Sequence, residues 1–401
     1  MTDGLDRTLL DLATKHALRA AGHEQSDPMV GAVLSRQQAG QTRILAIGHH
    51  TGFGEAHAEV EALEQARSAG HDLRGATMHV TLEPCSHTGK RPPCTRALIE
   101  AGIGRVICAR RDEHLQARGG AQLLRQAGID FAFTHASPRA WELSSPFMHR
   151  VRTGLPWVIA KWAQTIDGRL STRTGHSKWI SSATSRAMVH RWRARTDAIF
   201  SSAETVLADD AELTARDIYT SADVRPRRTP LRIVADRQLR LAGHIGCKLI
   251  STRSKSPIVI LTTAANADSA AARELVALGI AVRGVSDDHT TGTLDLPAAI
   301  SLLAAEYPLS TILLEAGARF VGTCLASGIV NELAIFTAPL LLADSPGEPN
   351  EQTGILSGRQ LVREMSAAAY WRPVLRAARG DDSLVIYRAG RGMADEAPVD
   401  G

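Results

Sequence analysis

The sequence carries its most informative text at His57-Ala58-Glu59 and at Pro84-Cys85-Ser86-His87-Thr88-Gly89-Lys90-Arg91-Pro92-Pro93-Cys94. These two stretches supply one imidazole, two thiols and one carboxylate. One His and two Cys ligands leave the fourth tetrahedral position of a zinc ion open to water, which is the arrangement of a catalytic rather than a structural site. Zinc lowers the pKa of such a water to about 7. Glu59 lies two residues from His57 and is placed to move a proton from that water to a leaving amine.

The order of these residues, their spacing and the proline before Cys85 match the pattern of zinc-dependent deaminases. Two structural alternatives remain open. In the first, the residues are a core histidine, two buried thiols and a surface carboxylate. In the second, they form a closed structural zinc site with His87 as the fourth ligand. Eight residues separate Cys85 from Cys94, and this insert carries Lys90 and Arg91. Two cations beside a zinc site indicate an anionic small molecule, most simply one that carries a phosphate.

Length and composition indicate a two-domain globular protein. The 401 residues are 44% hydrophobic and 22% charged. Five cysteines without the spacing of a disulfide framework predict a reducing, cytoplasmic environment, with free thiols at Cys108, Cys247 and Cys324. The N-terminus lacks the apolar core of a signal peptide, and no apolar run approaches the ~20 residues of a membrane span. The net charge of +4 is not gathered into a basic arm, so it does not by itself indicate nucleic-acid binding.

The first domain, residues 1–150, is predicted to be a mixed sheet between layers of helices. Apolar periodicity predicts helices over 5–21, 57–69, 94–101 and 120–126, and strands over 30–34, 44–47, 77–81, 106–109 and 129–133. Two of the three metal-binding side chains therefore enter helices at their N-termini. The positive end of the helix dipole favours thiolates and a zinc-bound hydroxide there.

The second domain, residues 151–390, is predicted to be an α/β domain of its own. We interpret residues 136–154 as a packed connector, with the boundary near Arg152. Strands are expected over 157–162, 198–201, 231–235, 258–261, 312–314, 332–336, 371–375 and 383–387, and helices over 183–193, 269–278, 296–306 and 320–326. The tail, residues 391–401, has no apolar period and is predicted to be disordered.

The second half carries a weaker chemical signal. No Gly-x-Gly-x-x-Gly follows its first strand, so the Rossmann fingerprint is missing. The residues from Leu313 to Phe320 predict a strand that ends in a glycine turn and opens a helix. The free N–H groups of that helix can hold a pyrophosphate, with Arg319 adding charge. The alternative is a purely structural turn at Gly317.

From about residue 5 to residue 389 the chain resembles the bifunctional deaminase–reductases of riboflavin biosynthesis. In the first half the matching text is His57-Ala58-Glu59-Val60 and the block from Thr81 to Cys94. In the second half it is Lys161, Thr165-Ile166-Asp167-Gly168-Arg169, Ser177-Lys178-Trp179-Ile180, Thr205-Val206-Leu207-Ala208-Asp209-Asp210, Leu213-Thr214-Ala215-Arg216 and Glu315-Ala316-Gly317. The resemblance implies a cytidine-deaminase-like three-layer α/β/α domain followed by a dihydrofolate-reductase-like α/β domain.

The resemblance also implies two successive reactions on phosphoribosyl pyrimidines. A zinc-dependent hydrolysis removes the amine at C2 of 2,5-diamino-6-(5-phosphoribosylamino)pyrimidin-4-one. NADPH then reduces the ribosyl group of the resulting 5-amino-6-(5-phosphoribosylamino)uracil. The implied cofactors are one Zn²⁺ per chain and NADPH. The implied partners are these small molecules and further copies of the chain, with no nucleic acid and no membrane.

Site residues follow from the resemblance position by position. Zinc is expected on His57, Cys85 and Cys94, with Glu59 as the catalytic proton shuttle. The deaminase substrate is expected to contact Asp27, His50, Lys90 and Asp112. The cofactor is expected to contact Ala163, Trp179, Thr205, Asp209, Arg237, Gly317, Ala318, Arg319, Phe320, Val321, Gly322 and Thr323. The reductase substrate is expected to contact Lys161, Ser177, Arg193, Leu213, Arg216 and Glu315. Arg193 and Arg216 suit a phosphate by bidentate geometry, and Trp179 can stack on a flat ring.

The chain departs from the family pattern at four places. Asp27-Pro28 stands where the family usually has Asn-Pro, and Asp112-Glu113-His114-Leu115 stands where it reads Asp-Pro-Asn-Pro. Arg237 replaces a Ser that commonly meets the cofactor, and Leu341-Leu342-Ala343 lacks a usual glycine. These departures leave the zinc chemistry intact and concern the deaminase substrate.

The departures define the leading alternative, a divergent copy with an active reductase and a deaminase of altered substrate or lost activity. Two further alternatives are a base deaminase that acts on nucleic acid and a non-enzymatic zinc module. The long insert between the cysteines and the missing basic, aromatic face disfavour the first of these. The position of Glu59 beside the metal ligands disfavours a non-enzymatic zinc module, which would not need this carboxylate.

Overall fold

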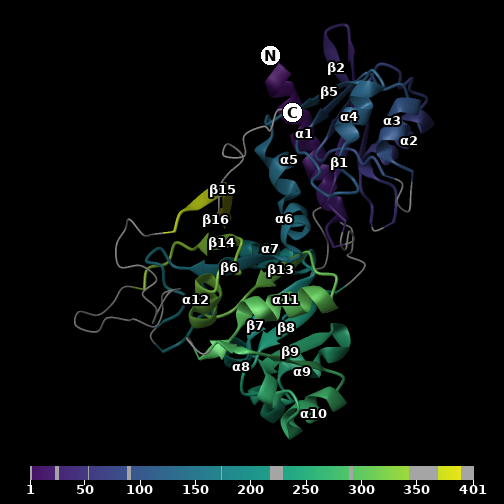
Figure 1. The fold of residues 1–401 in the computed structure, drawn as a ribbon. Helices are drawn as coiled ribbons and strands as arrows, with labels where there is room; N and C mark the ends of the chain where they lie inside the picture. Colours follow the sequence, from purple (N-terminus) through teal and green to yellow (C-terminus); the bar gives the residue numbers. More distant parts are fainter. Residues whose placement is uncertain are drawn as a thin grey trace. The chain divides into compact units, whose positions relative to one another are not determined.

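The computed structural model describes residues 2–22, 27–52, 54–87, 92–172, 174–216, 229–288, 292–342 and 369–389. Within this part the chain forms two compact units, one that runs to Gly154 and one that begins at Leu155. Each has its own sheet and its own core (Figure 1). Three predicted features lie outside the described residues: Lys90, Ala343 and the tail 391–401. No helix among the described residues is long and apolar enough to cross a bilayer.

The first unit contains a five-stranded mixed sheet. Its elements are α1 (Thr2–Ala17), η1 (Leu18–Ala20), β1 (Gly31–Gln38), β2 (Gln41–His49), α2 (Ala58–Ser68), β3 (Thr77–Val80), α3 (Cys94–Glu100), β4 (Arg105–Cys108), α4 (Gly120–Gln126), β5 (Asp130–Phe133), α5 (Pro138–Leu143) and α6 (Ser145–Thr153). The strand order is β2-β1-β3-β4-β5. β1 is antiparallel to both its neighbours, and β3, β4 and β5 are parallel. The predicted mixed sheet is confirmed.

Helices cover both faces of this sheet, and two glycines let them approach closely. A Cβ at Gly31 would lie 2.0 Å from the carbonyl oxygen of Ala13 in α1. A Cβ at Gly48 would lie 2.1 Å from the carbonyl oxygen of Ala58 in α2. Gly48 pairs with Ala32, the neighbour of Gly31 along β1, so the two glycines point to opposite faces. α1 and α2 therefore form separate outer layers, and α2 is held tightly against β2 at the residue that follows His57.

The predicted connector forms α5 and α6 within the first unit. Ser137 caps α5 by accepting a hydrogen bond from the Ala140 N–H. The guanidinium of Arg110, just beyond β4, lies 3.8 Å from the centre of the Trp141 ring and donates to the Trp141 carbonyl and the Ser145 hydroxyl. The apolar patch in this segment thus anchors it to the end of β4.

The second unit contains a nine-stranded sheet. Its elements are β6 (Trp157–Gln164), α7 (Ala183–Arg193), β7 (Ala198–Ser202), α8 (Ala203–Asp209), β8 (Leu231–Ala235), η2 (Arg240–His244), α9 (Lys248–Ser251), η3 (Arg253–Lys255), β9 (Ile258–Thr263), η4 (Ala264–Asn266), α10 (Ala270–Ala277), β10 (Ala281–Val285), β11 (Asp287–Asp288), β12 (Thr293–Leu294), α11 (Leu296–Glu306), β13 (Thr311–Leu314), α12 (Ala318–Ala326), β14 (Glu332–Thr337), β15 (Trp371–Arg379) and β16 (Asp382–Ala389). The order is β10-β9-β8-β7-β13-β6-β14-β16-β15. In this spatial order, the strands from β10 through β6 to β14 are parallel, and β16 is antiparallel to both its neighbours. β11 and β12 form a separate antiparallel pair.

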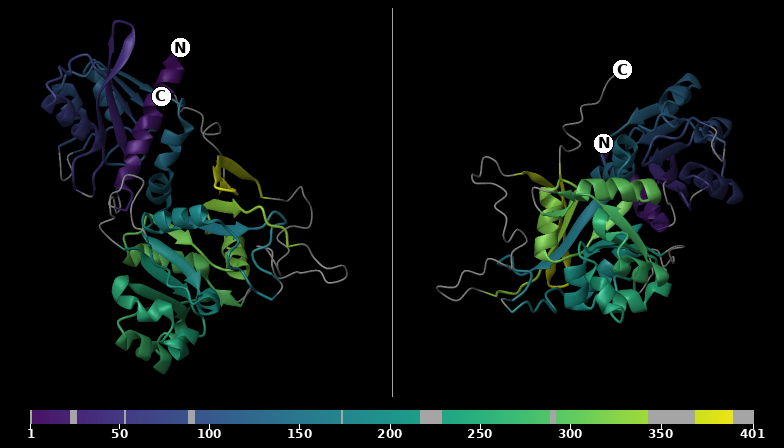
Figure 2. Two further views of the ribbon diagram at one scale, coloured as in Figure 1. Left: turned by 180° about the vertical axis from the view of Figure 1, so that it is seen from behind. Right: turned by 60° about the horizontal axis from the view of Figure 1, so that its bottom comes forward.

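Alternate residues of the parallel strands enter two different cores, as expected for a sheet buried on both faces. Phe200 and Ile233 pack with α11 and α12, whereas Ile199 and Val234 pack with α8, α9 and α10. The layers can be followed in Figure 2. The predicted α/β fold class is confirmed, although the sequence did not predict α8 or β10. Each is short, seven and five residues respectively.

β13 is inserted between β6 and β7, although it follows them by more than a hundred residues. The chain runs from β7 toward β10 on one side and then returns to β13. Parallel sheets bind ligands beyond the carboxyl ends of the strands where the order reverses in this way. The carboxyl ends of β6, β7 and β13 are therefore the expected site in the second unit.

Candidate functional site

The three predicted metal ligands converge in the first unit. The Nδ1 atom of His57 lies 3.2 Å from the Sγ atom of Cys94 and 3.6 Å from that of Cys85, and all three atoms lie within 4.8 Å of one another. Bond lengths of about 2.0–2.1 Å to nitrogen and 2.3 Å to sulfur in a tetrahedron separate such donors by about 3.6 Å. The donor set fits zinc in both geometry and chemistry.

Local structure explains why these side chains meet. His57 is the extended residue before α2, and Cys94 is the first residue of α3. The backbone N–H of Cys94 donates to the Cys85 sulfur at 3.3 Å, and the Thr95 hydroxyl donates to the Cys85 carbonyl. The loop after β3 is thereby fixed to the start of α3. As predicted, two of the ligands lie at helix N-termini.

The cluster is open rather than closed. Among the described residues, the group that could hold a metal consists of His57, Cys85 and Cys94 alone. His87 lines the adjacent cavity but does not belong to that group. The structural alternative with His87 as the fourth ligand is therefore not supported, and three protein ligands are typical of catalytic zinc.

The two cysteine ligands differ in the pKa of their thiols. Hydrogen bonds from the Cys94 thiol and from His57 lower the pKa of Cys85 to about 4, although burial acts in the opposite direction. The hydrogen bond between the two thiols and burial raise the pKa of Cys94 well above its usual value. The lowered pKa favours the thiolate form of Cys85, which is the form that ligates zinc.

Glu59 lies in the first turn of α2 and is 3% exposed. Burial raises the pKa of its carboxyl group above the usual value, although the charge of His57 acts against this. A raised pKa suits a carboxyl group that must take up and release a proton in general acid–base catalysis. Glu59 is outside the ligand cluster but lines the same cavity.

That cavity has a volume of about 660 Å³, the size of a small-molecule site. The predicted substrate residues Asp27, His50 and Asp112 all line it. Asp27 accepts a hydrogen bond from Nε2 of His50 at 3.2 Å, so the departure from Asn gives the imidazole a charged partner. The ring of His50 meets that of His57 edge to face at 5.3 Å.

Asp112 is held by residues that the sequence analysis overlooked. Glu83 accepts hydrogen bonds from the N–H groups of Asp112 and Ala121. Asp112 itself accepts from the N–H of His114 at 2.8 Å. Burial, together with the charge of Glu83, raises the pKa of Asp112 to about 6. The signal for Glu83 was its place in the Thr81–Cys94 block.

In the second unit, three predicted substrate residues meet at the expected edge of the sheet. Glu315 follows β13, and Lys161 lies on β6. The Nε atom of Arg193 lies 2.6 Å from one carboxylate oxygen of Glu315, and Lys161 Nζ lies 3.3 Å from the other. Burial alone would raise the pKa of Glu315, but the charges of Arg193 and Lys161 outweigh it and lower the pKa to about 2. The guanidinium fork that was expected to bind phosphate is here engaged by a carboxylate.

The predicted cofactor residues surround two adjacent helix starts. Gly317 precedes α12 and donates its N–H to the Thr205 hydroxyl at 2.9 Å, which joins α12 to α8. No side chain caps α12 at Gly317, so its first N–H groups suit a phosphate. The sequence places Ala318, Phe320, Val321, Gly322 and Thr323 in the first two turns of α12.

The remaining predicted residues lie around these elements. Arg319 pairs with Glu204 of α8. Trp179 is 69% exposed, with the guanidinium of Arg186 4.4 Å from its ring centre. Arg237, just beyond β8, forms an ion pair of 2.9 Å with Asp287. The others are placed as follows: Ala163 on β6, Asp209 at the end of α8, Ser177 half-buried between β6 and α7, Leu213 buried after α8, and Arg216 exposed, with its N–H donating to His190.

Comparison with known proteins covers both units. The family model described as the cytidine and deoxycytidylate deaminase zinc-binding region matches residues 4–110, and that described as the RibD C-terminal domain matches residues 156–370. The riboflavin biosynthesis protein RibD of Aquifex aeolicus is 32% identical over 96% of this chain and 98% of its own length. RibD of Escherichia coli is 36% identical over 84% of this chain and 88% of its own length.

A solved structure agrees with these sequence matches. A protein from Thermotoga maritima, described as a diaminohydroxyphosphoribosylaminopyrimidine deaminase/5-amino-6-(5-phosphoribosylamino)uracil reductase, is 28% identical and superimposes with a TM-score of 0.78. The superposition covers 97% of this chain and all of that one.

Proposed function

Since this chain belongs to the RibD family of riboflavin-biosynthesis proteins, we propose that it catalyses both reactions named for its Thermotoga maritima relative. The first is hydrolytic deamination of 2,5-diamino-6-(5-phosphoribosylamino)pyrimidin-4-one. The second is NADPH-dependent reduction of the ribosyl group of 5-amino-6-(5-phosphoribosylamino)uracil. The observation that carries the proposal is the open His57–Cys85–Cys94 cluster with Glu59 beside it.

Deamination is assigned to the first unit. Bound zinc supplies a water that is ionised near neutral pH. Glu59 would move a proton from water to the departing amine. Asp27, His50 and Asp112 orient the pyrimidine and sugar from the cavity wall, together with Lys90, which lies outside the described residues.

Reduction is assigned to the second unit. The N-terminus of α12 and the joined start of α8 hold the phosphates of NADPH, because their N–H groups and dipoles favour anions. Lys161, Arg193 and Glu315 bind the phosphoribosyl substrate beside the end of β6. The buried carboxylate fixes both cations in one orientation and stays ionised at neutral pH.

Domain limits, assembly and location belong to the same proposal. The deaminase domain extends to about residue 150 and the reductase domain from there to about residue 390. The compact units themselves divide at Gly154, which adds the end of α6 to the deaminase part. We infer a cytoplasmic homo-oligomer.

A two-step assay tests this function. The purified, zinc-loaded chain is given the diaminopyrimidine phosphate, first alone and then with NADPH or NADH. Deamination is followed by the pyrimidine absorbance and reduction by nicotinamide absorbance. Turnover in both steps supports the proposal. Reduction of the supplied uracil without deamination of the diaminopyrimidine would instead support the divergent copy.

A further inference from the structure

The connector helix α6 forms part of the wall of the zinc cavity. Phe147, Arg150, Val151 and Gly154 line the cavity that Glu59 and the zinc ligands also line. All of these residues belong to the first unit. The sequence had suggested only a packed connector here. A helix that lies outside the deaminase zinc-binding match, which ends at residue 110, thus contributes to the deaminase cavity.

The charges around this cavity are strongly asymmetric. Five carboxylate residues line it: Asp27, Glu55, Glu59, Glu83 and Asp112. Among the lining residues that the structure describes, Arg150 is the one lysine or arginine. The carboxylates repel a phosphate dianion, whereas the Arg150 guanidinium attracts it. An arginine also matches phosphate oxygens with two parallel hydrogen bonds.

We propose that Arg150 binds the phosphate of the deaminase substrate and so selects phosphorylated pyrimidines. The proposal rests on the proposed function, which gives the substrate its phosphate. It extends that function by assigning a phosphate subsite to α6, away from the motifs that hold zinc.

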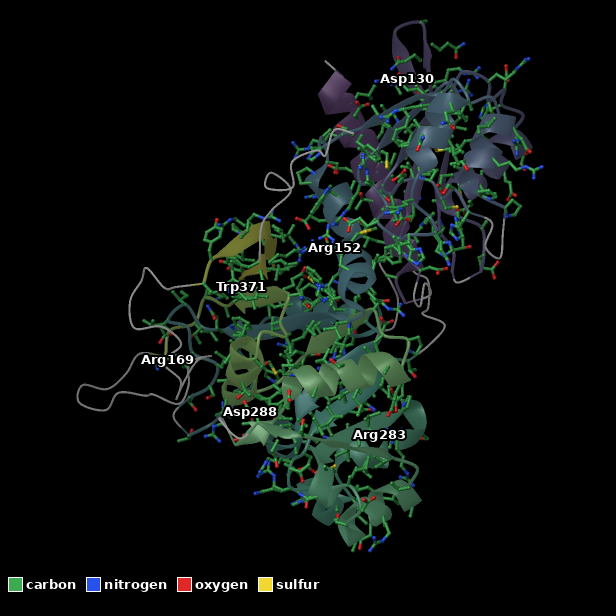
Figure 3. The ribbon with its side chains drawn as sticks, viewed as in Figure 1. Asp130, Arg152, Arg169, Arg283, Asp288 and Trp371 are labelled. Carbon is green, nitrogen blue, oxygen red and sulfur yellow. The ribbon has the colours of Figure 1, made fainter. Side chains whose placement is uncertain are left out.

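Two contacts join α6 to the loop that departs from the family pattern. The Arg152 guanidinium, labelled in Figure 3, pairs with Glu113, with Nε 2.6 Å from a carboxylate oxygen. The ring of His114 stacks on Phe147 with centres 6.5 Å apart and planes 27° apart. His114 in turn donates its N–H to Asp112 at 2.8 Å.

These contacts offer a physical reason for the departure. Two prolines stiffen the usual loop, because a proline fixes its own φ and restricts the residue before it. Here Glu113 and Leu115 replace them, and the loop is instead tied to α6 through Glu113 and His114. The loop, through Asp112 and His114, and α6, through Phe147 and Arg150, line the same cavity.

The test compares substrates with and without phosphate. The Arg150→Gln variant of the full, zinc-loaded chain is assayed for deamination of the phosphoribosyl diaminopyrimidine and of its dephosphorylated counterpart. We expect kcat/KM to fall at least tenfold for the phosphorylated substrate, mostly through KM. For the dephosphorylated compound kcat/KM, or its inhibition constant if turnover is too slow, should change less than twofold.

The matched control is Arg139→Gln, which removes the same charge at an exposed position of α5 and should leave turnover of both substrates unaffected. Zinc content and reductase turnover of each variant report on folding. If Arg150→Gln loses zinc, Arg150→Lys decides. It keeps the charge but not the fork, and should retain an intermediate KM for the phosphorylated substrate only.

Equal losses with both substrates, or no loss with either, would overturn the role of Arg150 while leaving the deaminase function intact. A wild-type chain that deaminates neither compound would instead remove the proposed function, and the phosphate subsite with it. The two failures are therefore distinguishable.

Discussion

At the scale of single residues, the proposed deaminase site separates metal ligation from proton transfer. His57 and the two cysteines provide the donor atoms, whereas Glu59 remains outside the cluster and is 3% exposed. Burial makes its carboxyl group more basic than usual, which brings it closer to the operating pH of a proton shuttle.

Glu59→Gln should reduce deamination by about 10²–10⁴-fold, the usual contribution of a general acid–base group. Zinc should stay bound at one ion per chain, since Glu59 is not a ligand, and the reductase should be unaffected. Metal content by atomic absorption and the two separate assays check this. Stoichiometric loss of zinc would make Glu59 a ligand.

Asp27→Asn should raise kcat/KM for the phosphoribosyl diaminopyrimidine. An amide supplies a donor for the sugar and removes a negative charge from a cavity that must accept a phosphate. The substitution also removes the ion pair between Asp27 and His50. An unchanged or lower kcat/KM would show that the pocket is adapted to Asp27, and would favour the divergent-substrate alternative.

The ionisation of Glu315 makes the folding stability of the second unit sensitive to acid. Its folded pKa of about 2 is lower than its ordinary 4.5. Its ionised form therefore contributes stability that is present above pH 4.5 and is lost as the pH falls toward 2. The shift corresponds to about 3 kcal/mol.

Calorimetric unfolding between pH 6 and pH 3 checks this contribution. Glu315→Gln should be destabilised at pH 6, because Arg193 and Lys161 lose their buried partner. The variant should also lose less stability than the wild type on acidification. Glu306→Gln, which removes a half-exposed partner of Arg283, is the control and should keep the wild-type pH dependence.

At the scale of elements, the reductase site depends on strand ends that the order of the sheet brings together. Glu315 after β13 lies between the ends of β6 and β7 because β13 is inserted there. Arg237 extends the same edge beyond β8, where its carbonyl accepts hydrogen bonds from Thr262 and Asn266. Its side chain is paired with Asp287 of β11, next to Asp288, which Figure 3 labels.

Arg237→Ser should weaken NADPH binding by about tenfold or more and leave NADH nearly unchanged. A guanidinium at this edge can pair with the 2′-phosphate that distinguishes the two cofactors, at about 1.5–3 kcal/mol. Half-exposed Asp287 is a weak competitor for that charge. Dissociation constants from fluorescence titration test this, and equal changes for both cofactors would return Arg237 to a surface role.

At the scale of the whole molecule, each unit has its own sheet, core and ligand groups. Leu155 packs against the core of the second unit, and β6 begins with the Trp157 N–H donating to the Ser310 carbonyl. α6, by contrast, lines the deaminase cavity. The boundary between activities thus follows the boundary between cores.

A fragment of residues 155–401 should fold and reduce the deaminated intermediate without the first unit. Its substrate residues and the α12 N-terminus all lie within it. Circular dichroism and NADPH-dependent turnover test this prediction. A folded fragment that binds NADPH but does not turn over would show that the reductase site needs the deaminase unit.

The sequence by itself predicted His57, Cys85 and Cys94 as zinc ligands, Glu59 as the proton shuttle, and the alternation of strands and helices. These features are local, because His57 and Glu59 share one helix start and the cysteines flank one loop. Elements of eight or more residues were predicted within a few residues, since apolar periodicity is strong over that length. The exception is nine-residue α6, which we interpreted only as part of a packed connector. Short α8 and β10 were missed for lack of such a period.

Only the tertiary structure shows how distant residues come together in one site. The insertion of β13 between β6 and β7 brings Glu315 to Lys161 across 154 positions of sequence. The packing of α6 brings Arg150 to a cavity whose motifs end at Cys94. No periodicity encodes such contacts, because they depend on strand order and on which faces of helices and sheets are buried against each other.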